Sequence, residues 1–371
     1  EDWKRANNLV DYTDMIETAW RDFECAPGAP DVLFVDEAQD LNPLMLAVVR
    51  KWANKSDQCV IAGDDDQVLY RFLGATPSAF LEPDIPDDRK FVLRQSYRVP
   101  RAVQEWAIKW ISRVSVREPK EYMPRDYEGS VVYGHAGLTY RSPLALIDDA
   151  QRHLSAGKTV MFLGACSYHV DPIRLALASE GIRFHNPYRS SNMLWNPLTA
   201  TRGVSVKDKF LAFLRRPWTV ADAKLWTSMV KVSGLRRHIR DLLEAWEDDR
   251  TLVVDEVIDF ESHEDLMDVF VFGDESQQVD WLAQNLLSGV KLDKVLSIYR
   301  RYGVGPLQEA PKVIVGTIHS VKGGEADVVY LFPDLSIAGG EEWNSGGAEA
   351  RDSVIRQFYV GATRARDTLV L

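Results

Sequence analysis

The sequence predicts an α/β fold that is built on parallel sheets and interrupted by a mainly helical insertion. Short apolar runs alternate with helix-like segments in the first half of the chain, which is the order that parallel strands with crossover helices produce. Strand candidates then become scarce between about residues 189 and 310 and return at KVIVGTIHS, DVVYLF and TLVL. An α/β domain that is interrupted by helices explains both observations.

The N-terminal segment predicts a helix followed by a strand–helix–strand unit. Residues 1–24 carry apolar side chains at helical spacing, and CAPGAP ends this pattern. DVLFVDEAQD then has the length of a strand, NPLMLAVVRKWANK is typical of a helix, and QCVIAGDDDQ is typical of a second strand. We expect both strands to be buried, with acidic residues at their carboxyl ends, where parallel sheets bind ligands.

A polar stretch separates this unit from a second strand–helix set. PRAVQEWAIKWISRV predicts a helix, and REPKEYMPRDYEGS follows it as a domain boundary. The second set begins at VVYGHAG and continues through TVMFLGA and PIRLALASEGI. We therefore expect a first domain at residues 1–128, a second domain made of residues 129–188 and 311–371, and a helical insertion at residues 189–310.

Gly157, Lys158 and Thr159 resemble the end of a phosphate-binding loop, but their context differs. In G-x-x-x-x-G-K-[ST] a strand precedes the glycines and a helix follows them. Here Arg152 stands where the first glycine would be, a helix-like segment comes before, and an apolar run comes after. Gly157 is therefore expected to end a helix, and the chain has no other Gly-Lys pair.

Composition limits the class of protein. The chain has 371 residues, 46% hydrophobic and 27% charged, with a net charge of −11, which is ordinary for a globular protein with more than one core. This charge argues against a uniformly basic surface, although a local basic track for nucleic acid stays possible. Three widely spaced cysteines and no long apolar run predict a cytoplasmic protein without membrane segments.

Two acidic residues follow the first predicted strand. Asp36 has the position of a residue that holds Mg²⁺, and Glu37 that of a base which orients and deprotonates water. Such a pair suits nucleoside triphosphate hydrolysis. Paired acids after a strand are about as often solvated loop residues, so the pair alone leaves both interpretations open.

The second predicted strand leads into GDDDQVLYRFLGA. Gln67 lies just past the strand end, where an amide can sense a γ-phosphate. Tyr70 and Phe72 follow, and aromatic side chains there can stack on unpaired bases. The alternative, with about equal weight, is that Tyr70 and Phe72 are core residues at helical spacing.

Three further segments carry candidate site residues. LRQSYRVP contains Tyr97 and Arg98, an aromatic ring beside a planar guanidinium. FYVGATRARDTL contains Arg364, which can act on a γ-phosphate if it is buried. TIHSVKGGEADVV forms a glycine-containing turn after a strand. Each segment also fits an ordinary surface ion pair, a satisfied histidine or a solvated turn. The candidate residues of that turn are Thr317, His319, Lys322, Gly323 and Glu325.

Taken together and in order, these segments resemble one family. DVLFVDEAQD, GDDDQVLYRFLGA, LRQSYRVP, TIHSVKGGEADVVYL and QFYVGATRARDTLVL are similar to motifs II to VI of the UvrD/Rep/PcrA-like superfamily 1A DNA helicases. The resemblance implies two RecA-like domains of the P-loop NTPase type, the first of them incomplete here. It also implies that ATP and Mg²⁺ bind between these domains, and that the motor moves 3′ to 5′ on single-stranded DNA and acts at single-strand/double-strand junctions.

The resemblance implies a role for each candidate. Asp36 corresponds to the Mg²⁺ residue and Glu37 to the catalytic base. Gln67 corresponds to the γ-phosphate sensor, with Arg98 and Arg364 as the two γ-phosphate arginines. Tyr97 corresponds to the adenine-stacking ring, and Glu325, next to Gly323, to the ribose contact. The DNA contacts implied are Tyr70, Phe72, Thr317 and His319.

The sequence also departs from this family. The phosphate loop lies upstream of motif II in the family, and only 35 residues precede Asp36 here. The first domain would then lack its central strand and expose an apolar face. We therefore expect this chain to be part of a helicase whose N-terminal portion lies elsewhere, and to hydrolyse no ATP alone. The alternatives are a non-catalytic DNA-binding or regulatory module and a helicase–nuclease. The pathway, whether DNA repair or DNA replication, stays open.

Overall fold

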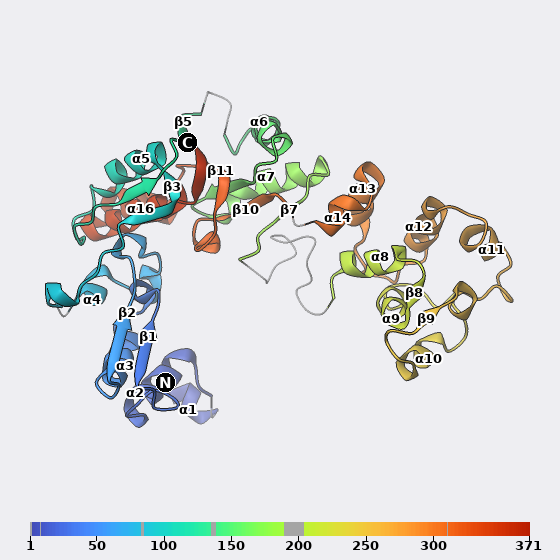
Figure 1. Ribbon diagram of the computed structural model, residues 1–371, viewed down its shortest axis with the longest axis horizontal. Helices are drawn as coiled ribbons and strands as arrows, with labels where there is room; N and C mark the ends of the chain where they lie inside the picture. Colours follow the sequence, from blue (N-terminus) through green and yellow to red (C-terminus); the bar gives the residue numbers. More distant parts are fainter. Residues whose placement is uncertain (1, 8, 83–84, 135–138, 189–203, 310) are drawn as a thin grey trace. The chain divides into compact units, whose positions relative to one another are not determined.

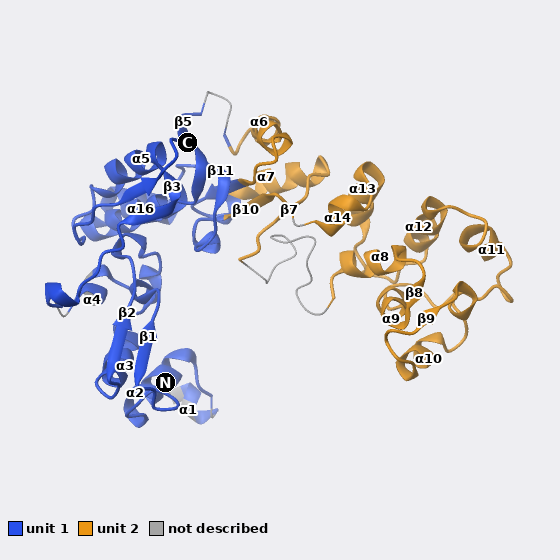
Figure 2. Cartoon of the chain, in the orientation of Figure 1, with its two compact units in different colours: residues 1–139, 161–169, 317–371 blue, residues 140–160, 170–316 orange. Residues whose placement is uncertain are grey.

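The computed structural model describes residues 2–7, 9–82, 85–134, 139–188, 204–309 and 311–371 (Figure 1). The chain forms two compact units, which are coloured separately in Figure 2. Unit 1 comprises residues 1–139, 161–169 and 317–371, and unit 2 comprises residues 140–160 and 170–316. No described helix combines the length and the apolar character that crossing a bilayer requires.

Unit 1 begins with two helices in the region where one helix is predicted, followed by the predicted strand–helix–strand unit. Parallel strands β1 and β2 pair from Val32↔Gln58 to Val35↔Ile61. Asn42 caps the helix between them through a hydrogen bond from the Met45 amide of 2.9 Å. The bounds are α1 Asp2–Ala6, α2 Tyr12–Asp22, β1 Val32–Val35, α3 Pro43–Ala53, β2 Gln58–Ile61 and α4 Pro77–Leu81.

The expectation that β1 and β2 are buried is wrong. Phe34 is 75% exposed, and neither strand has a buried residue. Among the described residues these two strands form a sheet of their own, so their apolar side chains have no neighbouring strands or covering helices on much of their surface. The separate expectation of an exposed apolar face in the first domain agrees with this arrangement.

The segment after this sheet carries three more elements of unit 1: β3 Gln95–Pro100, α5 Arg101–Ile111 and β4 Met123–Arg125. Strand β4 lies within the polar stretch and pairs in parallel with β3. Helix α5 buries Val103, Ala107 and Ile111, which share one face at helical spacing. The Trp110 indole of α5 also donates a 2.9 Å hydrogen bond to the Ile355 carbonyl. The polar stretch is thus folded onto unit 1.

A six-stranded sheet has the order β5-β12-β11-β6-β10-β7. The pairs β10–β7, β11–β12 and β12–β5 are parallel, so the predicted parallel α/β fold of RecA-like type is confirmed. The elements of this sheet and its nearby helices are β5 Ser130–Val132, α6 Pro143–Ser155, β6 Val160–Gly164, α7 Ser167–Ser179, β7 Phe184–His185, β10 Val313–Thr317, β11 Ala326–Leu331, α15 Ile337–Ser345, α16 Gly347–Ala362 and β12 Ala365–Val370.

Gly157 ends helix α6, as the sequence predicts. Its φ of +82° lies in the left-handed region, which glycine reaches without steric cost. Its amide donates to the Leu154 carbonyl at 3.0 Å, and strand β6 follows it. The Gly-Lys-Thr sequence is therefore not a phosphate-binding loop.

The remaining part of unit 2 is mainly helical, as predicted, and has an apolar core of its own. Phe210, Phe213, Trp218 and Trp226 are fully buried in this core. The predicted boundaries at residues 189 and 310 lie outside the described residues, and the four-segment division stays a prediction. The elements are α8 Val206–Leu214, β8 Trp218–Thr219, α9 Val220–Thr227, α10 Ile239–Ala245, β9 Thr251–Leu252, α11 Asp265–Phe270, α12 Glu275–Gln284, α13 Asp293–Tyr302 and α14 Gly305–Gln308.

Candidate active site

The acidic pair at the end of β1 is held in an unusual backbone conformation. The Asp36 carboxylate accepts a 2.8 Å hydrogen bond from the Glu37 amide. Glu37 itself has φ +52° and ψ +37°, a left-handed conformation that costs a non-glycine residue about 1–2 kcal/mol. The Glu37 side chain is 58% exposed, so water reaches the carboxylate. Local strain and open access are both typical of functional residues.

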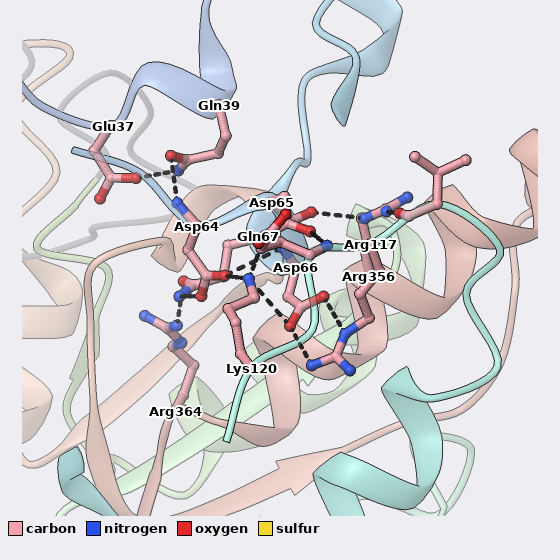
Figure 3. A network of polar contacts seen from close by, with 12 residues as sticks. Glu37, Gln39, Asp64, Asp65, Asp66, Gln67, Arg117, Lys120, Arg356 and Arg364 are labelled. Carbon is pink, nitrogen blue, oxygen red and sulfur yellow. Dashed lines mark hydrogen bonds and ion pairs between the residues drawn. The ribbon is translucent and has the colours of Figure 1, made fainter. Parts of the chain in front are cut away.

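Two side chains fix the Glu37 carboxylate. The Gln39 amide donates a hydrogen bond to Glu37 Oε2, and Lys322 Nζ lies 3.2 Å from the same atom. Lys322 also pairs with Asp40. Gln39 is buried, and its Oε1 accepts from the Asp64 amide at 2.9 Å. Gln39 therefore connects the residues that follow β1 with those that follow β2 (Figure 3).

Gly63 is required by this connection. A Cβ at position 63 would lie 2.6 Å from Gln39 Oε1 and 2.8 Å from the Phe80 ring. Both distances are below van der Waals contact, so a larger residue would displace Gln39. The close approach explains why glycine stands directly before the three aspartates.

Gln67 and Arg364 contact each other through their side chains, although they lie 297 residues apart in the sequence (Figure 3). Arg364 Nη2 donates to Gln67 Oε1 at 3.1 Å, and Gln67 Nε2 donates to Asp64 Oδ2 at 2.6 Å. The Arg364 guanidinium is buried and also donates to the Val360 carbonyl at 2.9 Å. The burial of Arg364 meets the condition under which it could act on a γ-phosphate.

The buried Arg364 and the half-buried Arg98 form a positive region. Burial, together with the charge of Arg98, lowers the pKa of Arg364 to about 9. Burial also lowers the pKa of Arg98, whose Nε is buried without a hydrogen-bond partner in the described part of the chain. No described carboxylate lies within 4.0 Å of either guanidinium, although ion pairs occur elsewhere in unit 1. One buried and one half-buried cation without a carboxylate partner favour an anion such as a phosphate group.

The residues predicted to hold the nucleoside lie at the surface. Tyr97 is 85% exposed, and the Glu325 carboxylate accepts from Arg366 Nη1 at 3.1 Å. Gly323 has a φ of +85°, so the turn depends on glycine at this position. The assignment of these three residues to adenosine stays a prediction.

Asp36 is the residue that the sequence predicts as a ligand of Mg²⁺. The described residues contain no cluster of three or more acidic, histidine or cysteine side chains arranged to hold a metal ion. Mg²⁺ in nucleotide-hydrolysing enzymes is commonly held by one or two carboxylates, with phosphate oxygens and water completing the shell. The exposed Asp36 carboxylate fits the role of a single protein ligand.

Three of the predicted DNA residues form an aromatic cluster. Tyr70, Phe72 and His319 contact one another edge-on, with ring centroids 5.9 Å, 6.3 Å and 6.0 Å apart. Phe72 is 72% exposed, so the alternative that it is a core residue is wrong. Thr317 is buried, and its hydroxyl accepts a 3.3 Å hydrogen bond from the Ser320 amide. Thr317 thus supports the turn that carries His319.

Sequence reasoning missed the cations that neutralise the three consecutive aspartates. Arg117 makes two 2.8 Å hydrogen bonds to Asp66, and Lys120 pairs with all three carboxylates. Arg356 donates to the Asp65 carbonyl at 2.8 Å. A signal was present, because three adjacent acids need cationic partners if they are buried, and the stretch REPK supplies two cations.

Comparisons with known proteins point in one direction. The family model for the UvrD/REP helicase N-terminal domain matches residues 1–85. An ATP-dependent DNA helicase PcrA of Staphylococcus epidermidis is 28% identical over 162 residues, 41% of this chain and 22% of the relative. The protein of the same name in Staphylococcus aureus is 28% identical over 192 residues, 49% of this chain and 26% of the relative. The alignments thus span about a quarter of the length of these relatives.

Proposed function

We propose that this UvrD/Rep/PcrA-like helicase chain is part of a motor that couples ATP hydrolysis to 3′-to-5′ movement on single-stranded DNA. The observation that carries the proposal is the buried link between Gln67 and Arg364, with Arg98 unpaired beside it. An amide that is hydrogen-bonded to a buried arginine would respond to a phosphate group that binds the arginine. The segments that carry Gln67 and Arg364 would then both sense the phosphate.

The chain's own residues supply most of the hydrolytic chemistry. The exposed Glu37 carboxylate would accept a proton from an attacking water, since Gln39 and Lys322 hold it in place. Arg98 and Arg364 would neutralise charge that develops on the transferred phosphoryl group. Asp36 would hold Mg²⁺, which supplies further charge neutralisation at the phosphates when bound.

The aromatic cluster supports DNA as the track. Phe72 offers an exposed face for a base, and His319 and Tyr70 hold its edges. Lys322 Nζ lies 5.7 Å from the centre of the Tyr70 ring and 3.2 Å from Glu37. Lys322 thus contacts both Glu37, the proposed general base, and Tyr70 of the proposed DNA surface. DNA binding could therefore affect the hydrolytic residues through this lysine. A DNA motor of this kind would work in the cytoplasm.

The sequence contains no G-x-x-x-x-G-K-[ST] motif. In related chemistry the loop lysine and hydroxyl stabilise the phosphates, and losing a comparable positive group costs about 10³-fold or more in rate. We therefore assign hydrolysis to a protein that also supplies these groups, and expect little or none from these 371 residues alone. The missing motif also favours one other candidate, a non-catalytic DNA-binding module.

The test is ATP hydrolysis by this chain with and without single-stranded DNA, together with binding of a fluorescent ATP analogue. Glu37→Gln should remove whatever DNA-stimulated hydrolysis exists and leave analogue binding unchanged, because the amide cannot accept the proton. Glu17→Gln, an exposed glutamate of α2, is the matched control. Normal hydrolysis in Glu37→Gln would refute the base assignment. DNA binding without nucleotide binding would favour the non-catalytic module.

A further inference from the structure

Lys120 occupies a position that the proposed function has not used. It lies in the polar stretch between α5 and β4, yet its side chain is only 8% exposed. Its Nζ lies 2.5 Å from Asp64 Oδ1 and 3.4 Å from Asp66 Oδ2, and it also contacts Asp65. A buried lysine that meets three carboxylates is costly to place unless each contact is satisfied, so its position is well determined.

Asp64 transmits this contact to Gln67. One oxygen of Asp64 accepts from Lys120 Nζ, and the other accepts from Gln67 Nε2 at 2.6 Å. An ionised carboxylate can only accept hydrogen bonds, so it selects the nitrogen end of the Gln67 amide. The oxygen end must then face the other way, where Arg364 Nη2 donates to it at 3.1 Å. Figure 3 shows the resulting chain of contacts from Lys120 through Asp64 and Gln67 to Arg364.

Asp64 is ionised, and this charge state determines which end of the Gln67 amide faces it. Burial alone would raise the pKa of Asp64, but the charge of Lys120 and the hydrogen bonds from Lys120 and Gln67 outweigh burial and lower it. Burial would likewise lower the pKa of Lys120, and the three aspartates raise it instead. Asp64 therefore stays an acceptor.

Arg117 occupies the same acidic cluster but makes different contacts. Its guanidinium forms two hydrogen bonds with Asp66, and within the described part of the chain it makes no hydrogen bond or ion pair with Asp64 or Gln67. In this cluster Lys120 contacts Asp64, which is the hydrogen-bond partner of Gln67, whereas Arg117 stabilises the fold through Asp66. This difference separates a positioning role from a general stabilising one.

We propose that Lys120 is a positioning residue that acts through Asp64 to fix the Gln67 amide, so that its oxygen faces Arg364 and the site distinguishes a nucleoside triphosphate from a diphosphate. The inference rests on the proposed function for its nucleotide, and on the contacts of Lys120, Asp64 and Gln67 for its geometry. The inference adds Lys120, which lies outside the acidic and arginine motifs in the sequence, to the residues that determine nucleotide preference.

The first experiment observes Gln67 without any nucleotide. The side-chain NH₂ signals of Gln67 are identified in the ¹⁵N–¹H spectrum of the whole chain by their loss in Gln67→Met. Lys120→Met should shift these signals, and Arg117→Gln should leave them in place. Asp64→Asn, which keeps the shape of the side chain, is the second variant and should also shift them if Lys120→Met fails to fold. Unchanged signals in Asp64→Asn and in folded Lys120→Met would overturn the inference.

The second experiment measures the affinities of ATPγS and ADP by displacement of a fluorescent nucleotide. The parent chain should prefer ATPγS, and Lys120→Met should reduce that preference about tenfold, the scale of one charge-assisted hydrogen bond, with ADP affinity unchanged. Arg117→Gln should lower stability and keep the preference. A parent without any preference would refute the proposed function, while the NMR signals would still decide whether Lys120 positions Gln67. A preference retained in folded Lys120→Met would refute the role of Lys120 in discrimination.

Discussion

The helical part of unit 2 and the motif-bearing part of unit 1 bury opposite kinds of side chain. Residues 206–307 enclose an apolar core in which Trp218 and Trp226 are fully buried. In unit 1, the segments that follow β1 and β2 bury Asp65, Asp66 and Gln39, and expose Phe72. Apolar burial contributes about 25 cal/mol per Å², whereas buried charges seldom add net stability even when they are paired.

This difference teaches where each part obtains its structure. The helical part is stabilised by the hydrophobic effect and needs no ligand to explain its residues. The motif-bearing part gives up apolar burial and holds polar groups in fixed orientations, which is the arrangement that recognition of phosphate and DNA requires. Substitutions of similar chemistry should therefore have different effects in the two parts.

The largest effect is expected from Trp226→Ala. Trp226 is fully buried among Phe213 and Trp218, with ring centroids 5.3 Å and 4.7 Å away. Removing a buried aromatic ring leaves a cavity and should lower the free energy of unfolding by about 3–5 kcal/mol. Urea unfolding monitored by circular dichroism and hydrogen exchange within residues 206–307 measures this loss.

Trp226→Phe is the matched control for that variant. Trp226 Nε1 is buried without a hydrogen-bond partner among the described residues, so phenylalanine keeps most of the packing and removes an unsatisfied donor. It should cost much less than alanine. Equal losses for the two variants would show that ring packing does not dominate this core and would break the comparison.

A smaller effect, on binding and not on stability, is expected from Phe72→Ala. The exposed ring contributes little to folding, so the free energy of unfolding should change by no more than about 0.5 kcal/mol. Loss of base stacking should weaken single-stranded DNA binding by about 1–3 kcal/mol. Fluorescence anisotropy with a labelled oligonucleotide measures the affinity.

Phe91→Ala removes another exposed ring of unit 1, 88% exposed and outside the aromatic cluster. DNA affinity in this variant should match that of the parent chain. An equal loss for Phe72 and Phe91 would mean that exposed aromatic area in general, and not the cluster, binds DNA. No loss in either variant would remove Phe72 from the proposed DNA surface.

The smallest effect concerns pH. Burial lowers the pKa of His319 from 6.5, and the Leu69 carbonyl opposes this shift only partly. His319 therefore takes up a proton less readily in the folded chain than in the unfolded chain. The neutral His319 side chain leaves the folded state fully stable above pH 6.5, and the free energy of unfolding decreases as the pH falls further. His319→Asn should flatten the decline in the urea midpoint between pH 7.5 and 5.5. If the urea midpoint declined equally in His319→Asn, the pH dependence would belong to other titrating groups.

Much of the site could be predicted from the sequence because its signals are local. The apolar run that ends at Asp36 places this residue directly after a strand, and the structure agrees, whereas Gln67 lies in a short 3-10 turn six residues after the end of β2. The pattern around Arg364 left open whether its guanidinium is buried or lies in a surface ion pair, and the structure shows that it is buried. The order of the motifs predicted the fold, since alternating strands and helices leave few topologies.

The rest depends on contacts that no local pattern encodes. REPKEYMPRDYEGS is polar and was interpreted as a boundary, yet Lys120 is buried by pairing with acids 54 to 56 residues earlier in the chain. The exposure of β1 arises because a strand's burial depends on its neighbours in the sheet, and not on its own apolar residues. The left-handed backbone of Glu37 is likewise set by the turn around it.

The ion pairs of the acidic cluster also constrain how this protein can diverge. Asp64 and Lys120 lie 56 residues apart, and Asp66 and Arg117 lie 51 apart. A lineage that loses one partner keeps buried charges that are less fully neutralised, so a second change at the distant position would be favoured afterwards. Correlated substitutions at these pairs should therefore mark the descendants of this chain, even where the surrounding loops have changed beyond alignment.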